Sequence, residues 1–339
     1  MNTNQHELPL CSFVSSVVKG SLAVASRCVS DEQRDIFKDH INPTRMITSD
    51  QLVYTPAGSE KRAVVLDIDN TLTPPRRPLQ QEMADTLKRL KVPFFLGAGG
   101  DLRLVSEQFI EPLHEFGYRG TFDAFLCNGP TRYHCDLSRG ISVTLVRHFA
   151  MKEHMGAEKF ERMMKIVQAT LDREEFRLPP PMRVIGDLII DRESMVNVAP
   201  IGRPRERLGD EAHRNRDAFR EFDARTGYRR RFLAHLTREL AEFAPDGLFI
   251  SLGGETSFDL VIRGNDKGYP LKTLLEEGFE RVWYIGDALF AGGNDEAVLK
   301  YIEQWKGPQP CPVGAVQVEN FRATIGALQK LDMVHLPAE

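Results

Sequence analysis

Short apolar runs alternate with amphipathic helical patterns from Arg62 onward. The apolar run at residues 63–69 is followed by a helical pattern at 79–90, and a second apolar run occupies 92–99. This alternation is typical of βαβ units, in which helices cover both faces of a parallel sheet. Further strands of this kind are expected at residues 122–129, 282–287 and 314–318. We therefore predict an α/β fold built on a parallel sheet.

The segment between residues 143 and 263 has a different pattern of expected helices and strands. It combines helical patterns at 158–171 and 214–240 with a strand pair around 187–200 and a strand at 257–263. Such a mixture indicates a separate α+β unit, and a chain of 339 residues is long for a single hydrophobic core. We expect a core domain at residues 60–142 and 264–339, with an α+β cap domain at 143–263 inserted into it.

The first 59 residues form an extension that the sequence leaves without an assigned role. Residues 8–25 are apolar, but no lysine or arginine precedes them and Lys19 interrupts them, which argues against a secretory signal. Their apolar positions recur at helical spacing and predict an amphipathic helix. No stretch approaches the ~20 apolar residues of a membrane span, so no membrane association is expected.

Composition and charge narrow the classes of partner. A net charge of −4 provides no overall basic field, so no nucleic-acid partner is expected. The fractions of 42% hydrophobic and 27% charged residues are those of an ordinary soluble protein. Five cysteines without CxxC spacing fit neither a disulfide framework nor a zinc site, which favours reduced thiols and a cytoplasmic location.

Acidic residues directly follow two of the expected strands. Asp67 and Asp69 come at the end of the first strand, and Asp287, Asn294 and Asp295 follow the strand at 282–287. Ligands bind at the carboxyl ends of the strands in open α/β sheets, so these side chains are expected to meet there. Two aspartates alone could belong to a solvated turn. Two such clusters together form an oxygen-rich site of the kind that suits Mg²⁺.

Lys267 opens a helical pattern at the end of the inserted segment. A positive charge at this point can neutralise both a phosphoryl group and the carboxylate of Asp67. Because phosphoryl transfer depends mostly on positioning and on charge neutralisation, the three features together indicate this chemistry.

These motifs resemble those of the haloacid dehalogenase superfamily. The resemblance rests on the DxDxT pattern that begins at Asp67, on Lys267, and on the GD and GGND sequences within residues 286–295. It implies a Rossmann-like parallel-sheet core with an inserted cap. It also implies that Asp67 is the nucleophile that attacks phosphorus, that Asp69 is the general acid/base, and that Lys267 completes the catalytic set.

The same resemblance implies a bound Mg²⁺ ion as the cofactor. The implied ligands are the carboxylates of Asp67 and Asp287 and the main-chain carbonyl of Asp69. Asn294 and Asp295 are then expected to support these ligands.

The cap resembles that of the C2-capped, type IIB branch, and in particular the eukaryotic-type phosphomannomutases. The similarity rests on residues 197–203 and 253–259 and covers roughly residues 62–335. It implies that the phosphate that is not being transferred is held by Arg192, Arg203 and, after an insertion in this chain, Arg216. The fixed donor fork of arginine suits this role. The sugar is expected to contact Ser257 and Asp259.

Gly100 departs from the family pattern. The family has a serine at this position, at the end of the second core strand, to bind the transferring phosphoryl group. Gly100 can still offer its backbone N–H, but the lost hydroxyl corresponds to a hydrogen bond worth ~1.5–3 kcal/mol. Asn70, in place of the usual glycine of DxDGT, is a milder change.

Three functions are compatible with these residues. The resemblance implies a hexose-phosphate mutase of phosphomannomutase type, with a small-molecule sugar phosphate as its partner and the cap as the surface for a homodimer. A sugar-phosphate phosphatase, in which Asp69 activates water against phosphorylated Asp67, uses the same catalytic residues. A non-catalytic sugar-phosphate-binding protein is disfavoured because Asp67, Asp69 and Lys267 are all present.

Overall fold

The computed structural model describes residues 46–48, 60–204 and 210–335. The amphipathic helix expected within residues 8–25 lies outside these ranges. No helix in the described ranges combines the length and the hydropathy that crossing a bilayer requires.

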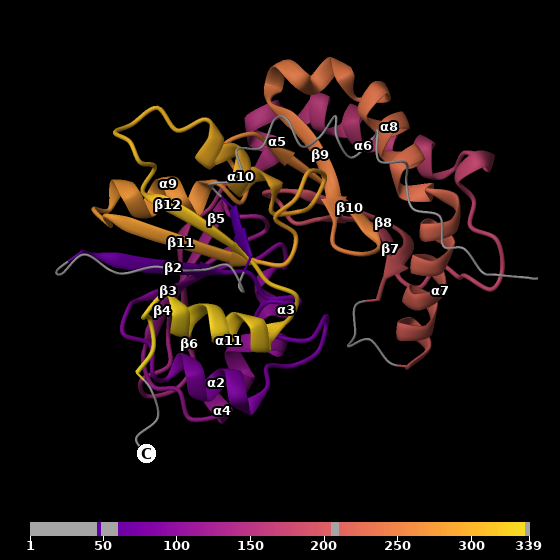
Figure 1. The fold of residues 1–339 in the computed structure, drawn as a ribbon. Helices are drawn as coiled ribbons and strands as arrows, with labels where there is room; N and C mark the ends of the chain where they lie inside the picture. The colour runs from indigo at the N-terminus through magenta and orange to yellow at the C-terminus, as the bar shows by residue number, and fades with distance from the viewer. Residues whose placement is uncertain (1–45, 49–59, 205–209, 336–339) are drawn as a thin grey trace, which may run out of the picture. The chain divides into compact units, whose positions relative to one another are not determined.

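The larger of the two sheets has eight strands in the order β1-β12-β11-β2-β3-β4-β5-β6. Its first six strands pair in parallel, and β5 and β6 continue the sheet in antiparallel fashion (Figure 1). In sheet order the strands are β1 (Met46–Thr48), β12 (Val313–Gln317), β11 (Arg281–Gly286), β2 (Arg62–Leu66), β3 (Phe94–Gly97), β4 (Thr121–Leu126), β5 (Thr131–Asp136) and β6 (Ser142–Arg147). The predicted α/β fold with a parallel sheet is therefore confirmed.

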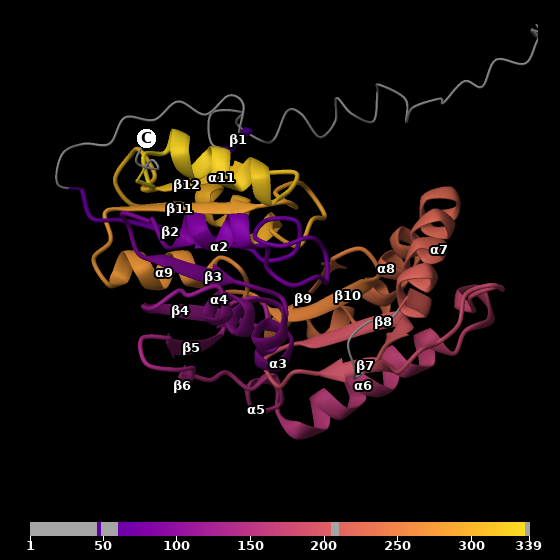
Figure 2. The same ribbon diagram turned by 90° about the horizontal axis from the view of Figure 1, so that it is seen from below.

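Both faces of this sheet are covered, as the buried residues of β2 show. Val64 and Leu66 belong to one hydrophobic cluster, whereas Ala63 and Val65 belong to another, because successive side chains of a strand point to opposite faces. Figure 2 shows helices on either side of the sheet. The first cluster includes residues of α2 (Gln81–Leu87), α3 (Leu102–Val105), α4 (Glu111–Glu115) and α11 (Phe321–Lys330), and the second includes residues of α9 (Tyr269–Glu276) and α10 (Glu296–Glu303).

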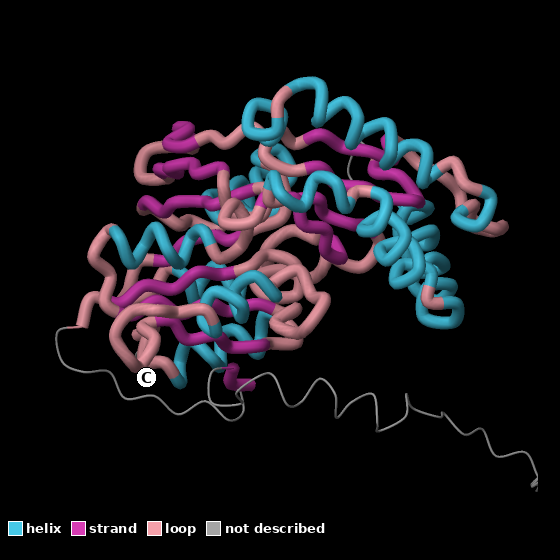
Figure 3. Tube along the Cα trace, turned by 90° about the horizontal axis from the view of Figure 1, so that it is seen from above, coloured by secondary structure: helices cyan, strands magenta, loops and turns pink. Residues whose placement is uncertain are grey.

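A second, antiparallel sheet has the strand order β7-β8-β10-β9. Its strands are β7 (Asp187–Asp191), β8 (Val196–Arg203), β10 (Ser257–Ile262) and β9 (Leu248–Gly253). Helices pack on one face of this sheet (Figure 3), with the ring of Phe232 stacked on that of Phe258 at 4.6 Å between centroids. These helices are α5 (Met151–Met155), α6 (Ala157–Leu171), α7 (Asp210–Thr226) and α8 (Tyr228–Glu239).

The structure differs from the expected elements at three places. The arginine-rich helix expected at 214–240 is divided into α7 and α8 by Gly227, whose φ of 63° lies in the left-handed region that glycine adopts without strain. Strands β1, β5, β6 and β9 were not anticipated. The expected start of the cap at residue 143 falls inside β6, which is paired with β5 in the larger sheet.

Candidate functional site

The carboxyl ends of β2 and β11 bring the two acidic clusters together. Leu66 is paired with Ile285, and the Asp67 N–H donates to the Ile285 carbonyl at 3.0 Å, so both strands end at the same edge. Carboxylate oxygens of Asp67, Asp287 and Asp295 lie within 4.8 Å of one another. Asp67 and Asp295 are buried and Asp287 is partly buried. Three of the five residues that the sequence placed at this edge therefore meet in one group.

Lys267 lies beneath this acidic group and is almost completely buried. Its ammonium donates to Asp67 at 2.8 Å and to Asp295 at 2.6 Å. The hydroxyl of Tyr284 also donates to Asp295 at 2.7 Å, and this hydrogen bond holds the Asp295 carboxylate in place. Burial opposes the charged ammonium, but Asp295 and Asp67 outweigh it and raise the pKa of Lys267 above its usual value. The lysine therefore provides a fixed positive charge at the acidic edge.

Gly286 makes room for this arrangement. A Cβ atom at this position would lie 2.4 Å from a carboxylate oxygen of Asp295, so a larger residue would push Asp295 away from the strand end. The absent side chain thus lets the loop carrying Asp295 fold back against β11, next to Asp287.

The carboxylates at the strand ends carry more negative charge than Lys267 alone can neutralise. Burial raises the pKa of Asp67 to about 8, in spite of the opposing effect of Lys267. Burial and the neighbouring Asp295 raise the pKa of Asp287 to about 6. Both raised pKa values mean that too little positive charge lies nearby to stabilise the ionised carboxylates. A bound cation would supply that charge.

The donor set at this edge fits a hard divalent cation. The groups available are carboxylate oxygens, which Mg²⁺ prefers, and the side chain of Asp287 is held by a 2.9 Å hydrogen bond from the Asn70 amide. Among the described residues, the side-chain oxygen of Asn294 is one of five buried polar atoms without a hydrogen-bond partner. A buried amide oxygen without a donor is an available ligand or a partner for a metal-bound water.

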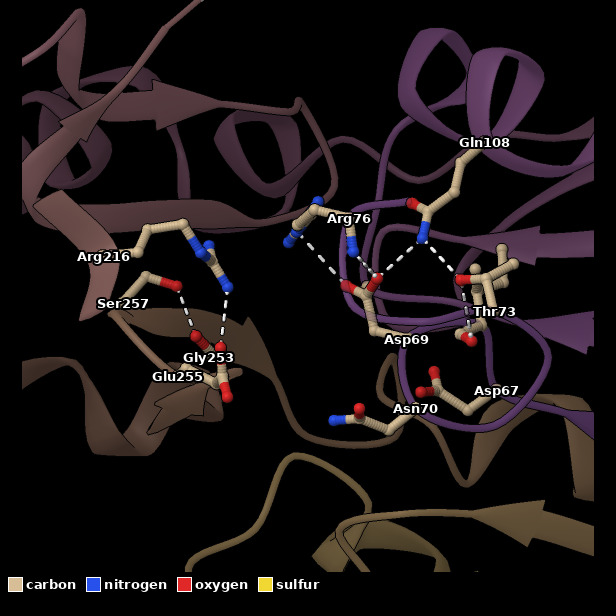
Figure 4. Close-up of polar contacts among 12 residues, drawn as sticks. Asp67, Asp69, Asn70, Thr73, Arg76, Gln108, Arg216, Gly253, Glu255 and Ser257 are labelled. Carbon is tan, nitrogen blue, oxygen red and sulfur yellow. Dashed lines mark hydrogen bonds and ion pairs between the residues drawn. The ribbon is translucent and has the colours of Figure 1, made fainter. Parts of the chain in front are cut away.

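Asp69 has a different environment from Asp67, as Figure 4 shows. One carboxylate oxygen accepts the backbone N–H of Arg76 at 2.8 Å and the side-chain amide of Gln108 at 2.7 Å. The other lies 3.2 Å from the guanidinium of Arg76. Burial opposes ionisation, but Arg76 and the two hydrogen bonds outweigh it and lower the pKa of Asp69. Two aspartates two residues apart are thus shifted in opposite directions.

Arg76 and Gln108 are site residues that sequence reasoning missed. They lie 7 and 39 residues from Asp69 in the chain, and neither forms part of a spaced motif. Gln108 belongs to the π-helical segment η1 (Ser106–Ile110), and such wide turns often re-aim a side chain at a functional site. A π-helical turn has no signal in the hydrophobic pattern that would have revealed it.

Residues of β8 and β10, in the second sheet, form a connected group of polar side chains. Arg203 donates to the Asn197 side-chain oxygen at 3.1 Å and to the Ser257 hydroxyl at 2.7 Å. Asn197 in turn donates to Asp259 at 2.6 Å. Ser257 and Asp259, both expected to contact a sugar, are buried in this group. Burial, followed by repulsion from neighbouring arginines, lowers the pKa of Arg203 well below its usual value.

The two other predicted arginines also face this region. Arg192 donates to the Gly99 carbonyl, and its buried Nε has no hydrogen-bond partner and lies 3.9 Å from the carboxylate of Asp101. Arg216 is buried on α7 and donates to Glu255 at 2.9 Å. In Figure 4, Arg216 and Glu255 lie across from Arg76 and Asp69.

A cavity of about 810 Å³ lies between these two groups of side chains. Of the predicted site residues, Asp67, Asp69, Asp287 and Asn294 line it from the larger sheet. Arg192, Arg203, Arg216, Ser257 and Asp259 line it from the second sheet and α7. Lys267 and Asp295 do not line the cavity themselves. Lys267 donates hydrogen bonds both to Asp295 and to Asp67, which does line it.

Gly100 is outside the cavity lining, whereas its neighbour Gly99 is part of it. A Cβ atom at Gly100 would lie 3.1 Å from Leu104 and 3.3 Å from Val105, which places it against the side chains of α3. The Gly100 carbonyl accepts the Cys127 N–H at 3.0 Å.

Comparison with known proteins supports the family resemblance inferred from the motifs. The family model for eukaryotic phosphomannomutase matches residues 82–304. The phosphomannomutase of Saccharomyces cerevisiae is 31% identical over 239 residues, which cover 70% of this chain and 84% of the yeast protein. That of Spinacia oleracea is 31% identical over 238 residues, covering 69% and 85%. Phosphomannomutase 1 of Homo sapiens is 30% identical over 244 residues, covering 70% and 82%.

Solved structures extend the likeness to the fold. An IMP-nucleotidase from Plasmodium falciparum superposes with a TM-score of 0.53, covering 80% of this chain and 67% of that one. Its sequence identity is 13%, so this similarity concerns the fold alone.

Proposed function

This chain belongs to the eukaryotic phosphomannomutase family, and we propose that it is a hexose-phosphate mutase that works through a phosphorylated Asp67. The observation that carries the proposal is the arrangement of charge around one cavity. A nucleophile and an acid/base, Asp67 and Asp69, line one wall, and arginines line the other. A mutase needs both walls, because its bisphosphate intermediate presents one phosphate to the nucleophile and the other to the cap.

The proposed nucleophile is the carboxylate of Asp67. Its hydrogen bond from Lys267 holds the carboxylate in place and stabilises the negative charge that develops during transfer. A Mg²⁺ ion held by Asp67, the Asp69 carbonyl and Asp287, with Asn294 beside them, would supply further neutralisation of the phosphoryl oxygens.

Asp69 is the proposed general acid/base. Its carboxylate faces the cavity and is kept ionised by Arg76, so it can accept the proton of the sugar hydroxyl that takes the phosphoryl group. Gln108 donates to both Asp69 and Thr73 at 2.7 Å and so holds the carboxylate in one orientation.

The opposite wall is the proposed binding site for the rest of the substrate. Arg192, Arg203 and Arg216 would hold the phosphate that is not being transferred, because guanidinium groups match phosphate oxygens in geometry and charge. The hydroxyl of Ser257 would donate to or accept from the sugar hydroxyls, and the carboxylate of Asp259 would accept from them.

Hydrolysis of a sugar phosphate is the second candidate. The side chain of Asp69 is 34% exposed, so water can reach the same carboxylate that would take a proton from a sugar hydroxyl. The phosphorylated Asp67 would then pass its phosphoryl group to water. The two reactions differ only in which acceptor is bound.

Phosphorus-31 NMR of the protein with Mg²⁺ and a panel of hexose 1- and 6-phosphates separates these outcomes. A mutase converts one sugar phosphate into the other, and a phosphatase releases inorganic phosphate. A binding protein does neither, and also leaves a generic aryl phosphate intact. Asp67→Asn is the control for contaminating activity, since it removes the proposed nucleophile.

We also infer the domain organisation and assembly from the family. The expected core at residues 60–142 and 264–339 would be extended by β6, which is paired with β5 in the larger sheet, so that the cap would begin after Arg147. A homodimer through the cap and a cytoplasmic location stay predictions. Sedimentation velocity of the full chain measures the first of these.

A further inference from the structure

Glu255 pairs with the guanidinium of Arg216. One carboxylate oxygen of Glu255 accepts from Arg216 at 2.9 Å, and the other lies 3.2 Å from Nε of Arg220. The Arg216 side chain is only 10% exposed, whereas that of Arg220 is 53% exposed. Glu255 therefore bridges one buried and one exposed arginine of α7.

The turn that carries Glu255 is itself held in place. It connects β9 to β10, and Gly254 adopts a φ of 55° there. Arg229, on α8, donates to the Gly254 carbonyl at 2.6 Å. Because the backbone is held in this way, a movement of the Glu255 carboxylate away from Arg216 would be a rotation of the side chain and not a rearrangement of the sheet.

The surroundings explain why a carboxylate is found at this position. Burial, together with the nearby positive charge of Arg76, lowers the pKa of Arg216, and Glu255 opposes this shift only in part. Glu255 lines the same cavity as Arg203 and Arg192 and is itself 30% exposed. It thus brings negative charge to a group of arginines.

A carboxylate and a phosphate offer the same kind of acceptor to a guanidinium. Each presents two oxygens that match the donor fork, and the bonds are strengthened by charge. Binding of a substrate phosphate at Arg216 would bring it against the carboxylate of Glu255, and two like charges at that distance repel each other.

We propose that Glu255 is a specificity-determining residue, an internal counter-anion that holds the place, on Arg216, of the phosphate that is not being transferred. It leaves Arg216 when the substrate binds and returns when the phosphate departs. This inference rests on the proposed function, in which Arg216 contacts the phosphate that is not being transferred.

Such a residue would serve a reaction in which the intermediate must turn over within the site. Both phosphates of a bisphosphate occupy the arginine wall in turn, so each contact there has to break once in every cycle. Strong binding that is equal in the ground state and the transition state does not accelerate the reaction. The return of Glu255 to Arg216 would weaken the hold on the departing phosphate.

The test is the affinity of Glu255→Gln for phosphate compounds. Glucose 6-phosphate, mannose 6-phosphate and inorganic phosphate are titrated calorimetrically into the metal-free full chain, where no turnover occurs. Replacing the carboxylate by an amide of the same shape should tighten binding by about tenfold, because the competing anion is removed. If Glu255 instead served only to orient Arg216, the substitution would weaken binding, and either weaker or unchanged binding overturns the proposal.

Glu221→Gln is the matched control. Glu221 also lines the cavity and lies on α7, so its substitution removes the same charge but leaves the pair of Glu255 with Arg216 intact. Its effect should stay within about twofold. In an Arg216→Ala background, Glu255→Gln should have no effect on binding; a persisting gain would show that general charge, and not Arg216, is responsible.

The proposed function and this inference fail separately. If phosphorus-31 NMR shows no sugar-phosphate reaction, the mutase and phosphatase proposals fall, while inorganic phosphate still reports whether Glu255 competes for Arg216. If the reaction is seen but Glu255→Gln binds phosphate no more tightly, only the role of Glu255 is lost.

Discussion

Lys267 donates a hydrogen bond to Asp67 at 2.8 Å, although the two residues are 200 positions apart in the chain. Asp67 directly follows β2, and Lys267 lies in the connection between β10 and α9. Both side chains are almost completely buried, and Lys267 shares its ammonium with Asp295. One lysine therefore links three distant segments of the chain at the candidate site, so its loss should affect stability and activity together.

We predict that Lys267→Met destabilises the protein by about 3 kcal/mol and lowers kcat by at least ~10²-fold. The first effect follows because removal of one partner leaves buried carboxylates without a counter-charge. The second follows because a charge that stabilises the transition state is lost. Urea denaturation and steady-state kinetics measure the two. Lys272→Met, at a lysine of α9 that is 61% exposed, should change the unfolding free energy by less than about 0.5 kcal/mol.

Asp67→Asn should abolish turnover, and Asp69→Asn should reduce it by ~10²–10⁴-fold while still allowing slow phosphorylation of Asp67. The reason is that the first change removes the nucleophile and the second only the group that moves a proton. Single-turnover phosphorylation with a labelled sugar phosphate distinguishes them. Turnover of Asp67→Asn within tenfold of the original protein would rule out the nucleophile role.

Mg²⁺ affinity should increase as the pH rises from about 5 to 8. The pKa of Asp287 is raised to about 6 and that of Asp67 to about 8, so protons occupy the proposed ligands at the acidic end of this range. The cation needs the ionised carboxylates, and its binding therefore releases protons that are harder to displace at low pH. The apparent Kd should fall by up to about tenfold per pH unit for each proton released.

Calorimetric titration of Mg²⁺ at a series of pH values measures this dependence. Asp287→Asn removes one titrating ligand, so it should weaken binding and flatten the pH dependence. The same shifts predict that the metal-free protein loses stability as the pH rises through this range, because its folded state retains protons that the unfolded state releases. An affinity that does not change with pH would show that these carboxyl groups are not the ligands.

The sequence was most informative about residues that directly follow parallel strands, because the ends of these strands lie at one edge of the sheet. Asp67 and Asp287 each come at the end of an apolar run, and parallel strands place such ends at one edge, so their meeting could be predicted. Arg203, Ser257 and Asp259 could be located only through family motifs. Nothing in their spacing indicates that Arg203 donates to Ser257 across 54 residues.

Other features depend on loops and packing that no local pattern encodes. The hydrogen bonds of Asp69 to Arg76 and Gln108 arise from the path of a loop and from a π-helical turn. The pair of Glu255 with Arg216 arises from the packing of α7 against the β9–β10 turn. Strand β6 carries exposed apolar residues such as Leu145 and Val146 and lacks the alternation that marks a half-buried strand.

We predict that Arg203→Ala weakens the use of hexose phosphates by at least ~10-fold more than that of a small aryl phosphate. The aryl compound has no sugar hydroxyls and no further polar group to contact the wall that Arg203 shares with Asn197 and Ser257. The ratio of kcat/KM values for the two substrates measures this difference. Arg214→Ala, at an exposed arginine of α7, should leave the ratio unchanged. Equal losses on both substrates with Arg203→Ala would mean that this arginine is structural.

The last prediction concerns Gly100, where the family has a serine. Sequence alone suggested that Gly100→Ser would restore a hydrogen bond to the phosphoryl group. The structure points to a smaller effect, because a Cβ atom here lies 3.1 Å from Leu104 and faces α3, and Gly100 does not line the cavity. We therefore expect kcat/KM to rise by no more than about twofold, with a loss of about 1 kcal/mol in stability as Leu104 shifts.

Gly100→Ala separates the two contributions of the serine. It introduces the same Cβ atom and the same contact with Leu104, but no hydroxyl. If both variants behave alike in steady-state kinetics and in urea denaturation, the hydroxyl does not reach the phosphoryl group and the backbone is the only donor at this position. If the serine variant exceeds the alanine variant in kcat/KM by about tenfold, a difference of ~1.4 kcal/mol, the hydroxyl does bind there. In that case the loop between β3 and α3 must adopt another conformation during the reaction, since a Cβ atom at Gly100 points at the side chains of α3 in this structure.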